Sequence, residues 1–246
     1  MDFLFQHCSV RQYKDEQVPE ELLKRIIEAG TRASTTGNMQ LYSVVLTRDP
    51  ENRKRLAPLH FSQGAVLQAP LLLTVCADVH RFSSWCDRRD ADASYDYFLW
   101  LVNALIDAML FAQNICVAAE TQGLGICYMG TTLYHAEEIG NLLNLPKGVL
   151  PVTAITMGYP AAQPAMTERL PVEAVIHEET YRDYTPGQID GYYAGQEALE
   201  SSLRFVEENR KQNLAQVFTD VRYPRADSVR FSEKLLEAVR KQGFRL

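Results

Sequence analysis

The sequence predicts a mixed α and β protein with about four or five strands. Short runs of apolar and β-branched residues alternate with stretches of helical periodicity along most of the chain. The chain has 246 residues, 46% hydrophobic and 23% charged, so one large domain can bury a substantial core. No internal repeat or low-complexity tract interrupts this order.

The first part of the chain is expected to alternate helices and strands. A helix is expected from Pro19 to Ala33, because Pro suits a first helical position and apolar residues recur at helical spacing. STTGNMQ follows as a loop, Leu41 to Arg48 as a strand, and RDPENRKRL begins a short charged helix. Pro70 to Asp78 is expected to be a strand buried on both faces, since it is continuously apolar. Residues 79–93 show no period, which indicates a loop or a mobile lid.

The most prominent expected element is a helix from Ser94 to Gln122, which contains neither Gly nor Pro. It is apolar on most sides, so we expect it to be the central buried helix. Polar residues interrupt it too often for a membrane span. The polar stripe of Asn103, Asp107 and Asn114 is expected to be a partly solvated or subunit-facing edge.

The second part is expected to begin with strands in GLGICYMG and VTAITMGYP, separated by the amphipathic helix AEEIGNLLNLP. The Pro-rich AAQPAMTERLP should be extended, and DYTPGQIDGYYAG is rich in turn residues. Two charged helices are expected at about 196–218 and 227–241. We expect a single domain, residues 1–246, in which residues 182–246 form a helical appendage.

Charge and cysteine content limit the partners and the compartment. The formal net charge of -6 argues against a nucleic acid or an anionic membrane as partner, although a local anion pocket remains open. The five cysteines form no CxxC and several lie in apolar runs, which is typical of a reducing compartment. The N-terminal residues lack a signal-peptide pattern, so we expect a cytoplasmic protein.

Several common catalytic devices are missing from the sequence. The five histidines are scattered and no HExxH supports them, so no metal site is expected. No GxSxG or GxxxxGK[ST] occurs. The glycines of GLGICYMG have neither the spacing nor the preceding strand of a dinucleotide-binding fingerprint.

Two groups of hydrogen-bond donors suggest ligand contacts instead. In HCSVRQY, alternation places three polar side chains on one side of an extended backbone, where they could form an anion pocket. A surface salt bridge and a helix cap are the ordinary alternatives. The loop RASTTGNMQ could bind the polar rim of a flat heterocycle, or be solvated only. The two groups are His7, Ser9 and Arg11, and Ser34, Thr35, Thr36, Asn38 and Gln40.

Together these segments resemble the FMN-dependent nitroreductase superfamily, and within it the larger oxygen-insensitive NADPH nitroreductase A and NADPH–flavin oxidoreductase subfamily. The resemblance covers essentially the whole chain. It rests on HCSVRQY, RASTTGNMQ, the region of Gln63, AMLFAQNICVAAETQGLGICYMG, GYP at 158–160, ERLP at 168–171 and VRKQGF near the end. It implies an α+β fold with a mainly antiparallel sheet flanked by helices. It also implies a homodimer with FMN at the subunit interface, and Ser94 to Gln122 as the dimer helix.

The resemblance further implies which residues bind FMN. The N-terminal motif would bind the phosphate and ribityl chain, the polar loop and the Gly turn would contact the ring, and Arg169 would be a second phosphate ligand. Arg210 and Arg225 are candidates for the 2′-phosphate of NADPH, with exposed helix charges as the alternative. No catalytic side chain is named, because the flavin performs the chemistry. The implied FMN contacts are His7, Cys8, Ser9, Val10, Arg11, Ser34, Thr35, Thr36, Asn38, Gln63, Tyr128, Met129, Gly130, Thr131 and Arg169.

The implied activity is a ping-pong transfer of hydride from NADPH or NADH to a small-molecule acceptor such as a nitroaromatic, a quinone or free flavin. A flavin-binding protein with low turnover is one alternative, and a dehalogenase or flavin-fragmenting enzyme is another. The sequence departs from the family pattern at three positions. Thr167 stands where a Lys is expected, Thr131 where Gly is common, and Asn38 where an apolar residue can occur.

Overall fold

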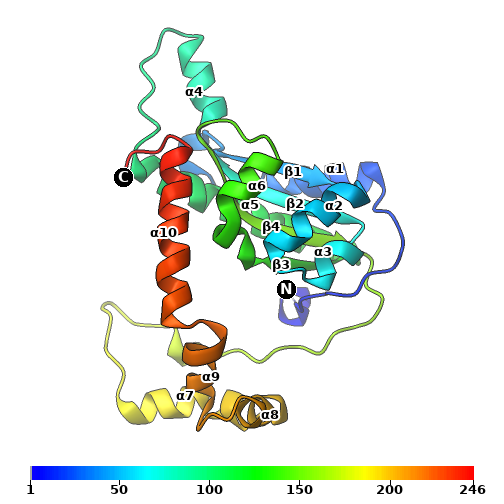
Figure 1. Cartoon of the computed structure of the whole chain (residues 1–246), viewed down its shortest axis with the longest axis vertical. Coiled ribbons are helices and arrows are strands. Elements are labelled where there is room, and N and C mark those ends of the chain that lie inside the picture. The colour runs from blue at the N-terminus through cyan, green and yellow to red at the C-terminus, as the bar shows by residue number, and fades with distance from the viewer. Residues whose placement is uncertain (1) are drawn as a thin grey trace. The chain divides into compact units, whose positions relative to one another are not determined.

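The computed structural model describes residues 2–246. The described residues form one four-stranded antiparallel sheet with strand order β1-β2-β4-β3, and the expected α+β class is confirmed (Figure 1). Register runs from Tyr42 opposite Ala77 in the first pair to Met129 opposite Ala154 in the last. The strands are β1 (Tyr42–Thr47), β2 (Leu71–Asp78), β3 (Gly125–Met129) and β4 (Val149–Gly158).

Helices account for most of the remaining described chain. The α-helices are α1 (Glu20–Gly30), α2 (Pro50–Leu56), α3 (Gly64–Gln68), α4 (His80–Asp87), α5 (Phe98–Thr121), α6 (Ala136–Leu142), α7 (Pro186–Ala198), α8 (Glu200–Glu208), α9 (Leu214–Val217) and α10 (Arg225–Lys241). Short 3₁₀ segments are η1 (Asp2–Gln6), η2 (Thr36–Asn38), η3 (Ala57–His60), η4 (Gly130–His135) and η5 (Val172–Ala174), and η6 (Phe218–Arg222) is a π turn.

The sheet is buried between two layers of helices. Alternate residues of a strand point to opposite faces, and in β2 Leu73 packs into the core formed with α1 and α5. Its neighbour Leu72 packs into the core formed with α2, α3 and α6. Every residue of β2 and of β4 is buried. The expected burial of β2 on both faces is therefore confirmed.

Helix α5 is the central helix that the sequence predicts, although it begins at Phe98 and not at Ser94. By length and composition alone it is apolar enough to cross a membrane, and 44% of the 18-residue window that meets this criterion is buried inside the protein, so this one helix is weak evidence for a membrane span. The expected solvated polar edge is wrong for Asp107, which is only 1% exposed. A buried carboxylate is stable there because backbone N–H groups donate to it.

The structure corrects the expected loop or lid at residues 79–93, because His80–Asp87 is helical. Asp78 accepts a hydrogen bond from the backbone N–H of Arg81 at 3.1 Å, which caps the first turn. Phe82 packs edge-on against Tyr95 with ring centroids 5.0 Å apart, and Cys86 is buried. The helix is stabilised by contacts outside itself, so it leaves no regular period in the sequence.

The segment DYTPGQIDGYYAG, which is rich in turn residues, is also largely helical, because α7 begins at Pro186. Thr185 and Gln188 form a capping box, and Pro186 occupies the first turn, where it needs no hydrogen-bond acceptor. The single helix expected at about 196–218 is wrong as well. Leu199 is extended, and Arg210 has a positive φ of 53°, so the segment is divided into α7, α8 and α9.

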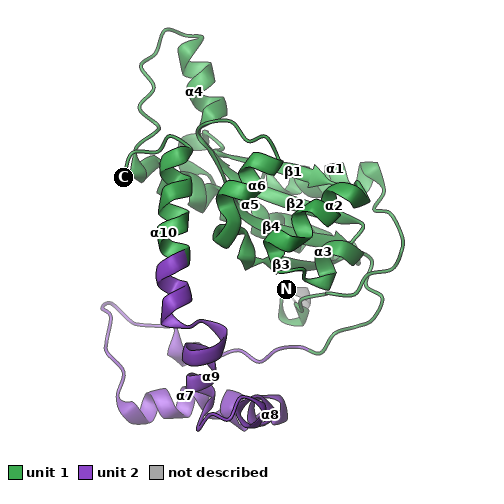
Figure 2. Ribbon diagram, viewed as in Figure 1, with its two compact units in different colours: residues 1–165, 231–246 green, residues 166–230 purple. Residues whose placement is uncertain are grey.

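The chain divides into two compact units (Figure 2). The first unit comprises residues 1–165 and 231–246 and holds the sheet. The second comprises residues 166–230. Among the described residues of the second unit only Ala174, Ser202 and Val217 are buried, so this unit has little core of its own.

Candidate functional site

The N-terminal segment is fixed against β3. The backbone N–H of Val10 donates to the carbonyl of Ile126 at 2.9 Å, and the Tyr13 hydroxyl donates to the Val10 carbonyl at 2.6 Å. Val10 is buried directly over Gly125, where a Cβ atom would lie only 2.5 Å from the Val10 side chain. The segment therefore needs Gly at position 125 to approach the strand this closely.

Ser9 and Arg11 flank the buried Val10 and both interact with Cys127 of β3. Burial raises the pKa of the Cys127 thiol, whereas the positive charge of Arg11 and hydrogen bonds from Ser9 and Arg11 lower it. Arg11 is exposed, and no carboxylate of the described residues forms an ion pair with it. On either side of Val10 the segment thus offers a hydroxyl and a guanidinium that has no carboxylate partner among the described residues, and such donors suit an anion.

His7 and Cys8 precede this pair and are half-buried. The Nδ1 atom of His7 lies 2.6 Å from the Glu120 carboxylate of α5, which accepts a hydrogen bond from it. The Nε2 atom is the ring nitrogen that remains for a ligand. Cys8 accepts a weak hydrogen bond from the Gln163 side chain at 3.8 Å.

The end of β3 leads from this pair to an open turn. Gly130 is exposed, and no other atom lies within 4 Å of the position that a Cβ would occupy. Cys127 and Gly130 are three residues apart, which corresponds to about 10 Å of extended chain. Met129 is buried in the core, while the Tyr128 hydroxyl donates to Gln113 at 3.3 Å. Burial raises the pKa of Tyr128, so its phenol is neutral.

The polar loop after α1 is closed by Asp107. The backbone N–H and the hydroxyl of Thr36 both donate to Asp107, at 2.8 and 3.1 Å. Both protons of Thr36 are therefore already used, so a ligand could contact only its oxygen or methyl group. Ser34 and Asn38 are exposed and Thr35 is half-buried, and Asn38 has a positive φ of 57°.

His60 contacts a candidate site residue, Thr131, and sequence reasoning did not single it out. Its ring is fully buried, its Nδ1 atom lies 2.9 Å from the Thr131 hydroxyl, and its Nε2 atom has no partner among the described residues. Burial, reinforced by His135, lowers the pKa of His60 to about 4, so the ring is neutral at pH 7. Gln63, half-buried, follows three residues later at the start of α3. Thr131 is 71 positions away, so no local pattern could have revealed the contact.

Arg169 lies in the second unit and is turned back onto its own chain. Its guanidinium donates to the Thr167 hydroxyl at 2.6 Å and to the Thr167 and Glu168 carbonyls at 3.2 Å. Thr167, which stands where a Lys is expected, thus holds this arginine in place.

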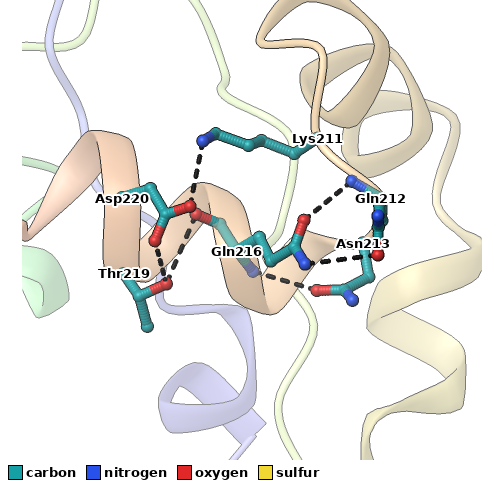
Figure 3. Close-up of polar contacts among 6 residues, drawn as sticks. All are labelled: Lys211, Gln212, Asn213, Gln216, Thr219 and Asp220. Atoms are coloured by element: carbon teal, nitrogen blue, oxygen red, sulfur yellow. Dashed lines mark hydrogen bonds and ion pairs between the residues drawn. The ribbon is translucent and has the colours of Figure 1, made fainter.

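Arg210 and Arg225 also lie in the second unit and are exposed, and neither forms an ion pair within the described part of the chain. Figure 3 shows the turn that follows Arg210. Lys211 donates to Asp220 at 2.9 Å, and the Asn213 side chain accepts the N–H of Gln216 to cap α9. Since Lys211 is engaged internally, Arg210 is the cation of this turn that remains available to a ligand.

Within the described residues, no group of three or more His, Cys, Asp or Glu side chains is arranged to hold a metal ion. The chain is thus an α+β protein. Its N-terminal segment carries donors that suit an anion, and it lies beside a strand that ends in an open turn at Gly130. The sequence profile of the Nitroreductase family matches residues 4–159, and the chain belongs to this family.

Curated relatives and solved structures agree with this assignment. The chain is 31% identical to an FMN reductase [NAD(P)H] of Bacillus subtilis, over 99% of this chain and 96% of that protein. It is 34% identical to an oxygen-insensitive NADPH nitroreductase of Salmonella typhimurium, over 74% of each chain. A crystal structure of an oxidoreductase from Bacteroides fragilis, described as putative in its own report, superposes with a TM-score of 0.98 at 47% identity and 99% coverage of both chains.

Proposed function

We propose that this protein is an FMN-dependent NAD(P)H oxidoreductase that transfers two electrons to a small acceptor such as a nitroaromatic, a quinone or free flavin. The observation that carries the proposal is the pair Ser9 and Arg11 beside Cys127, in the middle of the strand that leads to Gly130. The names of the FMN reductase and nitroreductase relatives support the same chemistry.

The residues present fit FMN on two counts. Arg11 is a cation without a carboxylate partner among the described residues, and Ser9 adds a hydroxyl beside it, which suits a phosphate. Gly130 leaves space where any other residue would place a Cβ, which suits the close approach of a flat ring to the backbone.

In the proposed mechanism the role of the protein is to bind and orient FMN. Bound FMN would supply the hydride and two-electron chemistry between NAD(P)H and the acceptor. Arg11 and Ser9 would hold the phosphate, and the backbone around Gly130 would donate hydrogen bonds to the ring. Gln63, Thr35 and Ser34 supply further donors, while the buried Met129 holds the turn in the core. No side chain of the chain is needed as a general acid or base.

We propose further that two copies of the chain form a homodimer in the cytoplasm, with FMN at the interface. Helix α5 supports this, because it is central to the core yet leaves large apolar side chains exposed. Such a row on a buried helix favours a protein partner. The five cysteines are all free, which agrees with a reducing compartment. The exposed side chains are Phe98, Leu99, Ile106, Met109 and Leu110.

An absorption spectrum of the purified protein, followed by stopped-flow mixing with NADPH or NADH, tests the proposal. We expect a yellow protein whose flavin band bleaches on addition of NAD(P)H and recovers on addition of a nitroaromatic or a quinone. A colourless protein that does not bind added FMN contradicts the proposal. A yellow protein that is not bleached supports the alternative of a flavin-binding protein with low turnover.

The choice of acceptor distinguishes the reductase proposal from the dehalogenase or flavin-fragmenting alternative. Reduced enzyme is mixed with a halogenated phenol or with a nitroaromatic under the same conditions. Reoxidation by the nitroaromatic alone supports the reductase proposal. Release of halide, or loss of the flavin itself, favours the alternative.

A further inference from the structure

His60 connects two of the segments of the first unit that are expected to contact the flavin, the turn before Gln63 and the turn at Gly130. It is the last residue of η3, and Gln63 follows after Phe61 and Ser62, both of which have positive φ angles of 53° and 54°. Its ring contacts Thr131, the residue after Gly130. The fully buried imidazole is therefore a direct polar link between the Gln63 turn and the Gly130 turn, beside the ring contacts of Phe61 with Tyr134 and His135.

The surroundings of the ring select one form of this imidazole. A protonated ring would donate from both nitrogens, but Nε2 is buried and has no partner among the described residues. Buried N–H groups without an acceptor are rarer than buried acceptors without a donor. The neutral form that carries its proton on Nδ1 leaves only a bare lone pair at Nε2. His135, the titratable neighbour, is engaged by Lys234 at 3.0 Å.

This tautomer determines what Thr131 can do. If Nδ1–H donates to the Thr131 oxygen, the hydroxyl proton of Thr131 is not used by His60 and is free for another acceptor. In the opposite tautomer Thr131 would donate its proton to Nδ1 and have none left. The protonation of His60 thus decides whether Thr131 is a donor to a ligand.

We propose that His60 is a positioning residue whose Nδ1–H donates to Thr131 Oγ1 and thereby directs the Thr131 hydroxyl proton toward the polar edge of bound FMN. The proposal rests on the proposed function. A donor aimed at the ring stabilises the electron-rich reduced flavin more than the oxidised flavin, so Thr131 and His60 together raise the flavin midpoint potential.

The first test reads the tautomer directly and does not depend on activity. The protein is labelled with ¹⁵N-histidine, and the His60 signals are assigned by their loss in His60→Asn. We expect a protonated Nδ1 and an unprotonated Nε2 at pH 7.5, with and without FMN. A protonated Nε2 overturns the proposal even where the protein proves to be a flavin reductase.

The second test measures the flavin midpoint potential and the binding of oxidised and reduced FMN in holoenzyme variants. We expect Thr131→Val and His60→Leu each to weaken binding of reduced FMN about tenfold relative to oxidised FMN, and the double variant to do no more than either. Thr131→Ser and His60→Asn keep a hydroxyl and an N–H donor and should stay near wild type.

The outcomes separate the inference from the function on which it rests. A His60→Leu variant that loses stability but keeps the wild-type potential has lost only packing, and this overturns the positioning role. Where His60→Leu does not fold, an unchanged potential in Thr131→Val overturns it equally. Protein that binds no FMN or is not reduced by NAD(P)H counts against the proposed function, while the tautomer measurement still decides the His60–Thr131 hydrogen bond.

Discussion

The carboxylate of Asp107, in the middle of α5, holds the backbone of Thr36 in the loop after α1. One oxygen accepts the N–H and the hydroxyl proton of Thr36 at 2.8 and 3.1 Å, and the other accepts the N–H of Leu41 at 3.2 Å. Asp107 is 1% exposed. A single buried charge therefore closes the loop that carries Ser34 and Asn38, and connects it to the central helix.

Replacing Asp107 by Ala should destabilise the protein by about 2–3 kcal/mol, because two backbone N–H groups lose a charged acceptor. Urea denaturation measures the loss, and hydrogen exchange of the Thr36 and Leu41 amides should accelerate. Asp107→Asn keeps one acceptor oxygen, so its stability should lie between that of the wild type and that of Asp107→Ala. Asp92→Ala, at an exposed carboxylate, is the matched control and should change stability by less than about 0.5 kcal/mol. Equal effects of the two Ala variants would contradict the role of Asp107.

The burial of His60 predicts a pH dependence of stability. Its pKa is lowered from 6.5 to about 4, so between these values the unfolded chain binds the proton and the folded chain does not. Stability therefore falls as the pH drops through this window, and above pH 6.5 His60 contributes no pH dependence. Between pH 7.5 and pH 5 the loss should be about 2 kcal/mol. Urea denaturation at the two pH values measures this difference.

His60→Asn removes the titrating ring and should flatten the pH dependence of unfolding by that amount. His80→Asn, at an exposed histidine, should leave it as in the wild type. If both variants keep the full pH dependence, another group is responsible for it.

Substitutions at two glycines, Gly125 and Gly130, distinguish effects on stability from effects on FMN binding. A Cβ at position 125 would lie 2.5–2.8 Å from the Val10 side chain. Gly125→Ala should therefore cost about 1–3 kcal/mol of stability and displace the segment that carries Arg11, which weakens FMN binding. Adding Val10→Ala should restore part of both losses. Gly130→Ala, where nothing lies within 4 Å, should leave the stability unchanged and alter FMN binding alone.

Arg11→Ala should weaken FMN binding by about 1.5–3 kcal/mol, or roughly ten- to hundredfold, because a charged hydrogen bond to the phosphate is lost. Fluorescence titration of the apoprotein measures the affinity. Riboflavin, which has no phosphate, should bind the variant as it binds the wild type. Arg88→Ala removes another exposed arginine and should have no effect on either ligand. An unchanged FMN affinity in Arg11→Ala would rule out the phosphate assignment.

Arg210→Ala and Arg225→Ala test the choice of nicotinamide. A contact to the 2′-phosphate predicts a loss of about tenfold or more in kcat/KM for NADPH, with kcat/KM for NADH unchanged. Arg204→Ala, on α8 and also exposed, is the control. If neither variant changes the ratio of the two kcat/KM values, both candidates are wrong.

Local patterns predict much of this fold because the buried strands and the central helix are long apolar segments that can be recognised in the sequence. Leu71–Asp78 is continuously apolar, and the sheet buries both of its faces. They fail at α4, which aromatic contacts stabilise, and at α7, which begins with a capping box, because neither helix has a regular apolar period. In HCSVRQY the alternation correctly separates the buried Val10 from the exposed Arg11.

By itself the sequence determined the α+β class and the family, and it predicted the row of donors around Arg11, because each depends on residues close together in the chain or on a whole-chain resemblance. Only the tertiary structure decided that Asp107 is a buried anchor, that Gly125 must accommodate Val10, and that His60 reaches Thr131. Each of those relationships joins residues that are distant in sequence. Their energy comes from burial and hydrogen bonding, which exist only once the chain has folded.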